Sequence, residues 1–175
     1  RFVMGYARVL VTEAGGLHGK NDLAGLGRLQ MMGARYGMYL ALPVTVLMVV
    51  MGGPILKIWM GKDYENPLLL TILAVGFLPY QVQRSTYHTL MGIGRHGAVS
   101  LLTLISGGVA VGLCLLFVGV FKWGLLGAAV GVAAPVAVGN LILVPYAGCR
   151  AVGISFLRYS YESLVPPILA VLPFT

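Results

Sequence analysis

Long apolar stretches separated by short polar connections dominate this sequence. Four of the stretches carry no charged residue: residues 36–56, 66–83, 97–121 and 123–149. Each is close to, or longer than, the roughly 20 residues that a helix needs to cross the hydrocarbon core of a membrane. The second is slightly short unless it continues past Arg84 toward Met91, and we predict that continuation.

The secondary structure of these stretches is predicted to be helical. In lipid every backbone N–H and C=O must be satisfied within the protein, and a barrel would show strands of about ten residues that alternate in polarity. The sequence shows no such alternation. It is 58% hydrophobic and only 10% charged, whereas about a quarter of the residues of a soluble domain are charged. The predicted class is therefore an all-α integral membrane protein, with successive helices antiparallel because their connections are short.

Three regions follow from the pattern. Residues 1–35 are less apolar, and we expect the tail of a preceding helix and an amphipathic cytoplasmic connector capped by Asn21 or Asp22. Residues 36–150 hold the four spans, and residues 151–175 are expected to form a cytoplasmic segment and the start of a fifth span. Because the sequence begins without Met and ends inside a short apolar segment, we expect a piece of a longer protein.

Loop charges predict the orientation. Nine of the 12 Lys and Arg residues lie before the first span, between the second and third, or after the fourth. Because positive charge is enriched in cytoplasmic loops, the N-terminal segment is predicted to be cytoplasmic, and the loop with Lys62, Asp63, Tyr64 and Glu65 to face outward. The residues responsible for the net charge of +7 thus lie in flanks near the lipid headgroups. The sequence shows no polar surface of interleaved basic and aromatic residues, which nucleic-acid binding would require.

A polar face is predicted near the cytoplasmic end of the second span. On a helix over residues 76–91, spacings of three and four residues bring together Tyr80, Gln81, Arg84, Tyr87 and His88. Polar and charged residues inside spans usually face a bundle interior or a watery cavity, so these five are candidate cargo contacts. A guanidinium can bind a diphosphate through two parallel hydrogen bonds, and tyrosine rings pack against sugars.

A structural role is the alternative for these polar residues. Arg84 could extend to the cytoplasmic headgroups and only help to fix the orientation of the span in the membrane. His88 could be a hydrogen-bonded packing residue. Pro43, Pro79 and Pro135 each remove a backbone hydrogen bond inside a span, so we expect kinks or hinges near them. Asn140 follows the last of these prolines and either satisfies a freed carbonyl, which we favour, or faces a cavity.

Several short motifs occur in a recognisable order. They are "LP" at Leu42, "GGPILKIWMGKDY" at the end of the first stretch, "LMGIGRH" after the second and "WGLLGAAVGVA" in the fourth. In this order they resemble the C-terminal half of polysaccharide (O-antigen) flippases of the multidrug, oligosaccharidyl-lipid and polysaccharide (MOP) exporter superfamily. The resemblance covers about residues 8–150. It implies that four full spans and a truncated fifth belong to a fold of twelve to fourteen helices arranged in two lobes.

The same resemblance implies a function. It is the alternating-access translocation of an undecaprenyl-diphosphate-linked oligosaccharide across a prokaryotic inner membrane, for biosynthesis of a cell-surface polysaccharide. The implied partners are the lipid-linked oligosaccharide, the lipid bilayer and polysaccharide polymerase machinery. A multidrug exporter of the same superfamily is the nearest alternative, although an intramembrane Arg84 would repel the cations that such exporters carry.

A membrane glycosyltransferase or polymerase is the enzyme alternative. General acid–base chemistry on sugars usually needs positioned carboxylates, and no Asp or Glu lies inside any predicted span. The sequence also has no metal-ligand spacing, phosphate-binding glycine loop or nucleophile triad. We therefore predict a transporter without catalytic residues, metal or cofactor, and a purely structural membrane subunit stays open as a further alternative.

Overall fold

The protein is described by a computed structural model that covers residues 2–61 and 66–171. Helices, and no strands, are found in that part of the chain: α1 (Phe2–Gly19), α2 (Leu23–Val50), α3 (Gly52–Met60), α4 (Pro67–Val82), α5 (Arg84–Gly92), α6 (His96–Cys114), α7 (Gly124–Val138), α8 (Val144–Val152) and α9 (Phe156–Val171). The π-helical turns η2 (Leu115–Val120) and η3 (Gly139–Leu143) extend α6 and join α7 to α8. The predicted outer-loop residues 62–65 lie outside the described part.

Three stretches among the described residues are long and apolar enough to cross a membrane. They are Leu23–Val50, Val99–Val120 and Gly124–Val152. The all-α class is confirmed for these residues, whereas the count of four full spans and a shorter fifth is not. The second and third stretches match the predicted spans 97–121 and 123–149 closely.

The first span begins earlier than predicted. Asp22 caps the start of α2 by accepting a hydrogen bond of 2.8 Å from the backbone N–H three residues later, and the helix then runs without a break past residue 36. The separate connector expected up to residue 35 is therefore part of the same helix as the span. Arg35 lies inside this helix, and its guanidinium has a partner on another helix, as described below. The end at Val50 also comes early, since Pro54 has no N–H to donate to the Val50 carbonyl.

The second predicted span is divided in two. Helix α4 has 16 residues, which gives a length of about 24 Å, less than the hydrocarbon core of about 30 Å. Gln83, with a ψ of −1°, separates it from α5. The predicted continuation toward Met91 is thus present as a second helix that begins at Arg84.

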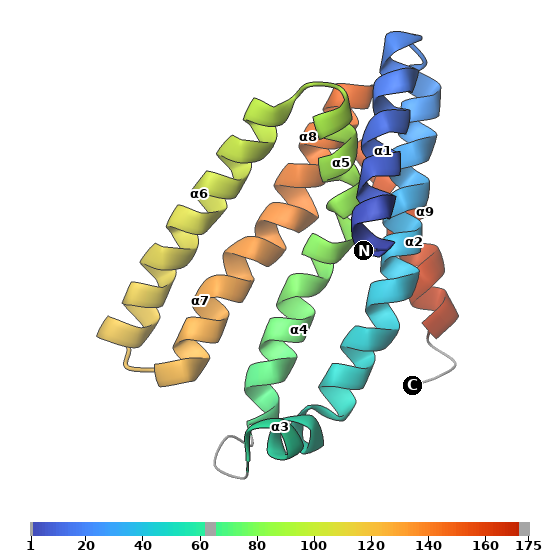
Figure 1. Ribbon diagram of the computed structural model, residues 1–175. Helices are drawn as coiled ribbons and strands as arrows, with labels where there is room; N and C mark the ends of the chain where they lie inside the picture. The colour runs from blue at the N-terminus through green and yellow to red at the C-terminus, as the bar shows by residue number, and fades with distance from the viewer. Residues whose placement is uncertain (1, 62–65, 172–175) are drawn as a thin grey trace.

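Figure 1 shows the arrangement of the helices. Helices α4 and α5 follow one another through the middle, the α6–α7 pair lies on one side, and α1, α2 and α9 lie on the other. The turns between α1 and α2, α5 and α6, and α8 and α9 gather at one end of the bundle, and α3 and the turn after η2 lie at the other. Lys20 and Arg95 lie in turns at the first end, and Lys122 in the turn at the second.

Helix α7 packs closely against both of its neighbours. A Cβ atom added to Gly76 of α4 would lie 2.5 Å from the Cβ of Ala133, and one added to Gly131 would lie 2.8 Å from the backbone nitrogen of Cys114. Small residues let helices approach this closely within membranes. Among the described elements, α6 packs mainly against α7. Large apolar side chains such as Leu104 are therefore exposed on α6, as expected of a surface that faces lipid.

Candidate functional site

The break between α4 and α5 places a run of polar residues in two different environments. Four of these side chains are buried: Gln83, Ser85, Thr86 and Thr89. Three others are exposed or half-buried: Arg84, Tyr87 and His88. Because residues three and four apart share a helix face, the two sets point to different sides of α5.

Two of the buried side chains, Gln83 and Thr86, belong to a hydrogen-bond network with a distant helix. The side-chain oxygen Oε1 of Gln83 accepts hydrogen bonds from the hydroxyl of Thr86 (2.8 Å) and from the hydroxyl of Tyr159 (2.9 Å). The two hydroxyl oxygens lie 3.2 Å apart. Tyr159 is 1% exposed and belongs to α9, so this network connects the start of α5 to a helix more than 70 residues away in the sequence.

A groove of about 630 Å³ lies between α2 and the α4–α5 pair. Large apolar side chains from both sides line it, among them Leu40, Met48 and Phe77, and Gly33 and Gly37 leave room on α2. Its polar lining residues, apart from Thr45, come from the end nearest α5: Gln81, Arg84, Ser85 and His88. The groove is therefore apolar along most of its length and carries the cation Arg84 at the end nearest α5. We call it the first groove.

A second groove, of about 520 Å³, lies between the α4–α5 pair and α6, α7 and η3. Tyr80 and Tyr87 line it with ring centroids 6.0 Å apart and ring planes tilted by 58°. The facing wall includes Thr103, Ser106 and Asn140. This groove offers aromatic faces together with hydroxyl and amide groups.

The five predicted site residues are divided between the two grooves. Gln81 lines the first groove and the two tyrosines line the second, while Arg84 and His88 line both. The single polar face expected from the sequence is thus a ridge between two grooves. Arg84 is exposed and makes no hydrogen bond or ion pair with any other described residue.

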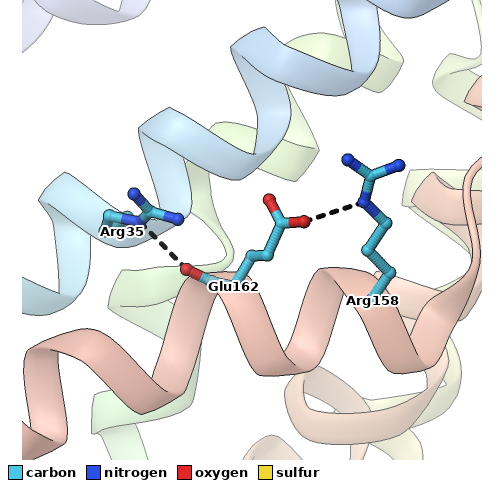
Figure 2. Close-up of polar contacts among 3 residues, drawn as sticks. All are labelled: Arg35, Arg158 and Glu162. Atoms are coloured by element: carbon cyan, nitrogen blue, oxygen red, sulfur yellow. Dashed lines mark hydrogen bonds and ion pairs between the residues drawn. The ribbon is translucent and has the colours of Figure 1, made fainter.

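Arg35, which lies inside the candidate span Leu23–Val50, has a partner on another helix. Figure 2 shows that its Nε donates a hydrogen bond of 2.9 Å to the backbone oxygen of Glu162 on α9, while the Glu162 carboxylate pairs with Arg158 at 2.8 Å. A helix carbonyl normally accepts from the residue four positions on. Here that residue is Pro166, which has no N–H. Arg35 therefore satisfies a carbonyl that the proline leaves free.

The three prolines predicted to kink spans lie inside helices. Pro43 lies within the uninterrupted α2, Pro79 lies four residues before the break at Gln83, and Pro135 lies four residues before η3. Two of the three thus precede an irregularity in the helix. Asn140 does bond a carbonyl, but it is that of Val136 and not the Gly131 carbonyl that Pro135 leaves free.

Sequence reasoning missed several residues of this region. Nothing in the local pattern points from Gln83 to Tyr159, and the place of Thr103 in the wall of the second groove depends on how α6 and α7 pack. Asn140, for which the sequence left a cavity-facing position open, lines that wall and also bonds a carbonyl. The polar run itself was the only available signal. No cluster of three or more His, Cys, Asp or Glu residues that could hold a metal ion occurs in the part of the chain that the structure describes.

The chain is similar to a known protein. The chain is 30% identical over 93 residues to a protein of Shigella flexneri named "Putative O-antigen transporter". The matched region is 52% of this chain but 22% of the relative, so the chain spans about a fifth of that protein. No protein-family model and no solved structure matches the chain. The apolar helices and this limited similarity fit a membrane transporter.

Proposed function

We propose that this chain forms part of a transporter that moves an undecaprenyl-diphosphate-linked oligosaccharide from the inner to the outer leaflet of a prokaryotic inner membrane. The observation that carries the proposal is Arg84, which lies on the ridge between the two grooves without a protein partner among the described residues. A cation at membrane depth is costly unless it is paired or serves a site. An anionic cargo would supply the missing partner.

The chemistry of the site fits the three parts of such a cargo. The guanidinium of Arg84 can donate two parallel charge-assisted hydrogen bonds to a diphosphate. The apolar length of the first groove suits a polyprenyl chain, and the tilted pair of Tyr80 and Tyr87 suits sugar rings, whose C–H faces pack on aromatic rings. The amphipathic cations carried by a drug exporter would be repelled by Arg84.

The proposal includes an arrangement in the membrane. Helices α4 and α5 together run over 26 residues, from Pro67 to Gly92, and a path of up to about 39 Å would be enough to serve as a further span. With α9 as the start of a fifth, the chain would contribute to one lobe of a two-lobe, alternating-access exporter of twelve to fourteen helices. The end that carries Lys20 and Arg95 would be cytoplasmic, because positive charge favours that side.

Complementation of a flippase-deficient strain tests the proposal. The full-length protein would be compared with Arg84→Ala and Arg84→Lys for surface glycan, at matched membrane abundance. We expect wild type to restore glycan and both variants to fail, since lysine keeps the charge but lacks the planar fork. Arg158→Ala is the matched control, because this exposed arginine lines neither groove. Full activity of both Arg84 variants would refute the role of Arg84, and failure of wild type with every glycan pathway tried would refute the function.

A further inference from the structure

A pocket of about 420 Å³ lies at the end of the bundle where the turns between α1 and α2 and between α8 and α9 gather (Figure 1). The first turns of α2 and the turn between α8 and α9 form its walls, and its apolar lining includes Leu23, Met31 and Ile154. A Cβ atom added to Gly27 would lie 3.0 Å from the side chain of Ile154, so the two walls approach closely there. We call this space the end pocket.

Two arginines line the end pocket, and they differ in their partners. Arg158 forms an ion pair of 2.8 Å with Glu162. Arg28 is exposed and makes no hydrogen bond or ion pair with another residue that the structure describes. It lies five residues after the start of α2, about 8 Å along the helix. Because α2 is a candidate span, this position corresponds to the headgroup region, roughly 5 to 8 Å deep in each leaflet.

The surface that continues from Arg28 toward the middle of the span is apolar. Met32 and Tyr36 follow Arg28 at intervals of four on the same face of α2, and they are 56% and 60% exposed. Leu157 and Tyr161 are also exposed, one helical turn apart on α9, which packs against α2. A cation followed by an apolar stripe matches the order of a lipid, whose phosphate is followed by its acyl chains.

We infer that the end pocket binds the headgroup of an anionic phospholipid, with Arg28 at the phosphate and an acyl chain along Met32 and Tyr36. Basic pockets between membrane helices recognise anionic headgroups in this way. The inference goes beyond the proposed function, because the end pocket shares no lining residue with either groove. Its ligand is a lipid of the surrounding bilayer and not a cargo, so failure of the proposed function would leave it standing.

Lipid binding by the purified full-length protein tests this inference. Native mass spectrometry in detergent would give apparent dissociation constants for dioleoylphosphatidylglycerol, which is anionic, and for dioleoylphosphatidylcholine, which is zwitterionic. Wild type is expected to bind the anionic lipid about fivefold more tightly, as one cation near a headgroup allows. Arg28→Gln is expected to bind the two lipids equally, and Arg28→Lys, which keeps the charge, to retain the preference.

Controls separate the end pocket from a general attraction to the basic end of the bundle. Arg95→Gln removes the same charge from a turn at the same end that lines neither the end pocket nor the grooves, and it should keep the wild-type preference. Glycerophosphoglycerol, the headgroup without acyl chains, should not displace the lipid at equal concentration. Arg28→Met replaces the glutamine variant if that variant fails to fold.

Three results would overturn the inference. Equal binding of both lipids by wild type would show that the protein does not select an anionic lipid. An equal loss of preference in Arg28→Gln and Arg95→Gln would assign the attraction to the basic end as a whole. Displacement by glycerophosphoglycerol at equal concentration would show that the end pocket binds a soluble phosphate ester without the help of the apolar stripe.

Discussion

Two sets of polar side chains at the start of α5 differ in what they bind. On the buried side, Oε1 of Gln83 accepts hydrogen bonds from the hydroxyls of Thr86 and Tyr159. On the groove side, Arg84 and His88 make no hydrogen bond or ion pair with other described residues. The two sets are neighbours in the sequence and alike in polarity. The difference is one of position: the bonded groups join α5 to α9, whereas Arg84 and His88 line the grooves.

Arg35 and Arg84, which both lie inside helices, differ in the same way. Arg35 is held by the carbonyl of Glu162, which Pro166 leaves without its usual donor. Its role is therefore to tie α2 to α9. Arg84 has no such partner among the residues that the structure describes, and it lies on the ridge between the grooves.

The largest effect on transport is expected when Arg84 is given an ion-pair partner within the protein. His88→Glu places a carboxylate four residues after Arg84, where it can form an ion pair along the helix. Transport should fall by about 10- to 100-fold, because the guanidinium would no longer be free for a diphosphate, whose charged hydrogen bonds contribute roughly 1.5 to 3 kcal/mol. Surface glycan per transporter in complemented cells measures this effect. His88→Gln is the control of similar size, and normal transport by the glutamate variant would show that Arg84 need not be free.

Removing the buried hydrogen bonds of Gln83 should lower the stability of the protein and leave transport unchanged. Gln83→Leu removes the acceptor shared by the hydroxyls of Thr86 and Tyr159, and we expect a loss of about 1 to 3 kcal/mol in the free energy of unfolding. Transport per folded molecule should stay near wild type. Unfolding in detergent measures the loss. The double variant with Tyr159→Phe should cost little more than Gln83→Leu alone, since both changes break one network; additive losses would argue against the network.

A smaller effect is expected at the contact between α2 and α9. Arg35→Met removes the donor to the Glu162 carbonyl and should lower the free energy of unfolding by about 1 kcal/mol. In a Pro166→Ala background that carbonyl regains an N–H from its own helix, so the same Arg35 change should cost less. A double-mutant cycle of unfolding free energies measures the difference. An unchanged cost in both backgrounds would contradict the role given to the proline.

The smallest effect is expected at the ion pair between Arg158 and Glu162. The Arg158 side chain is 68% exposed, and its partner lies one helical turn away. Exposed pairs of this kind are screened by water and salt. Arg158→Gln should therefore leave the melting temperature unchanged at low and high ionic strength, and a clear drop at low salt would show that the pair matters more than its exposure indicates.

The sequence predicted the helical class and the polar run, because apolar length and helical spacing are local properties. It did not predict that α2 continues past residue 36, since Arg35 is accommodated by a carbonyl 127 residues away. Nor did it predict that Gln83, where α4 and α5 meet, accepts a hydrogen bond from the hydroxyl of the distant residue Tyr159. The five candidate site residues were placed on one face because the helix was treated as isolated. Packing of α2 on one side and of α6 and α7 on the other turned that face into a ridge.

The most direct test of the central claim is the affinity of the purified full-length protein for undecaprenyl diphosphate with and without Arg84. Dissociation constants would be measured in nanodiscs for wild type, Arg84→Gln and the matched control Arg158→Gln. We predict that Arg84→Gln weakens binding by about 10- to 100-fold and that the control binds as wild type does. Equal affinities for all three proteins would contradict the claim that Arg84 binds the diphosphate of the cargo.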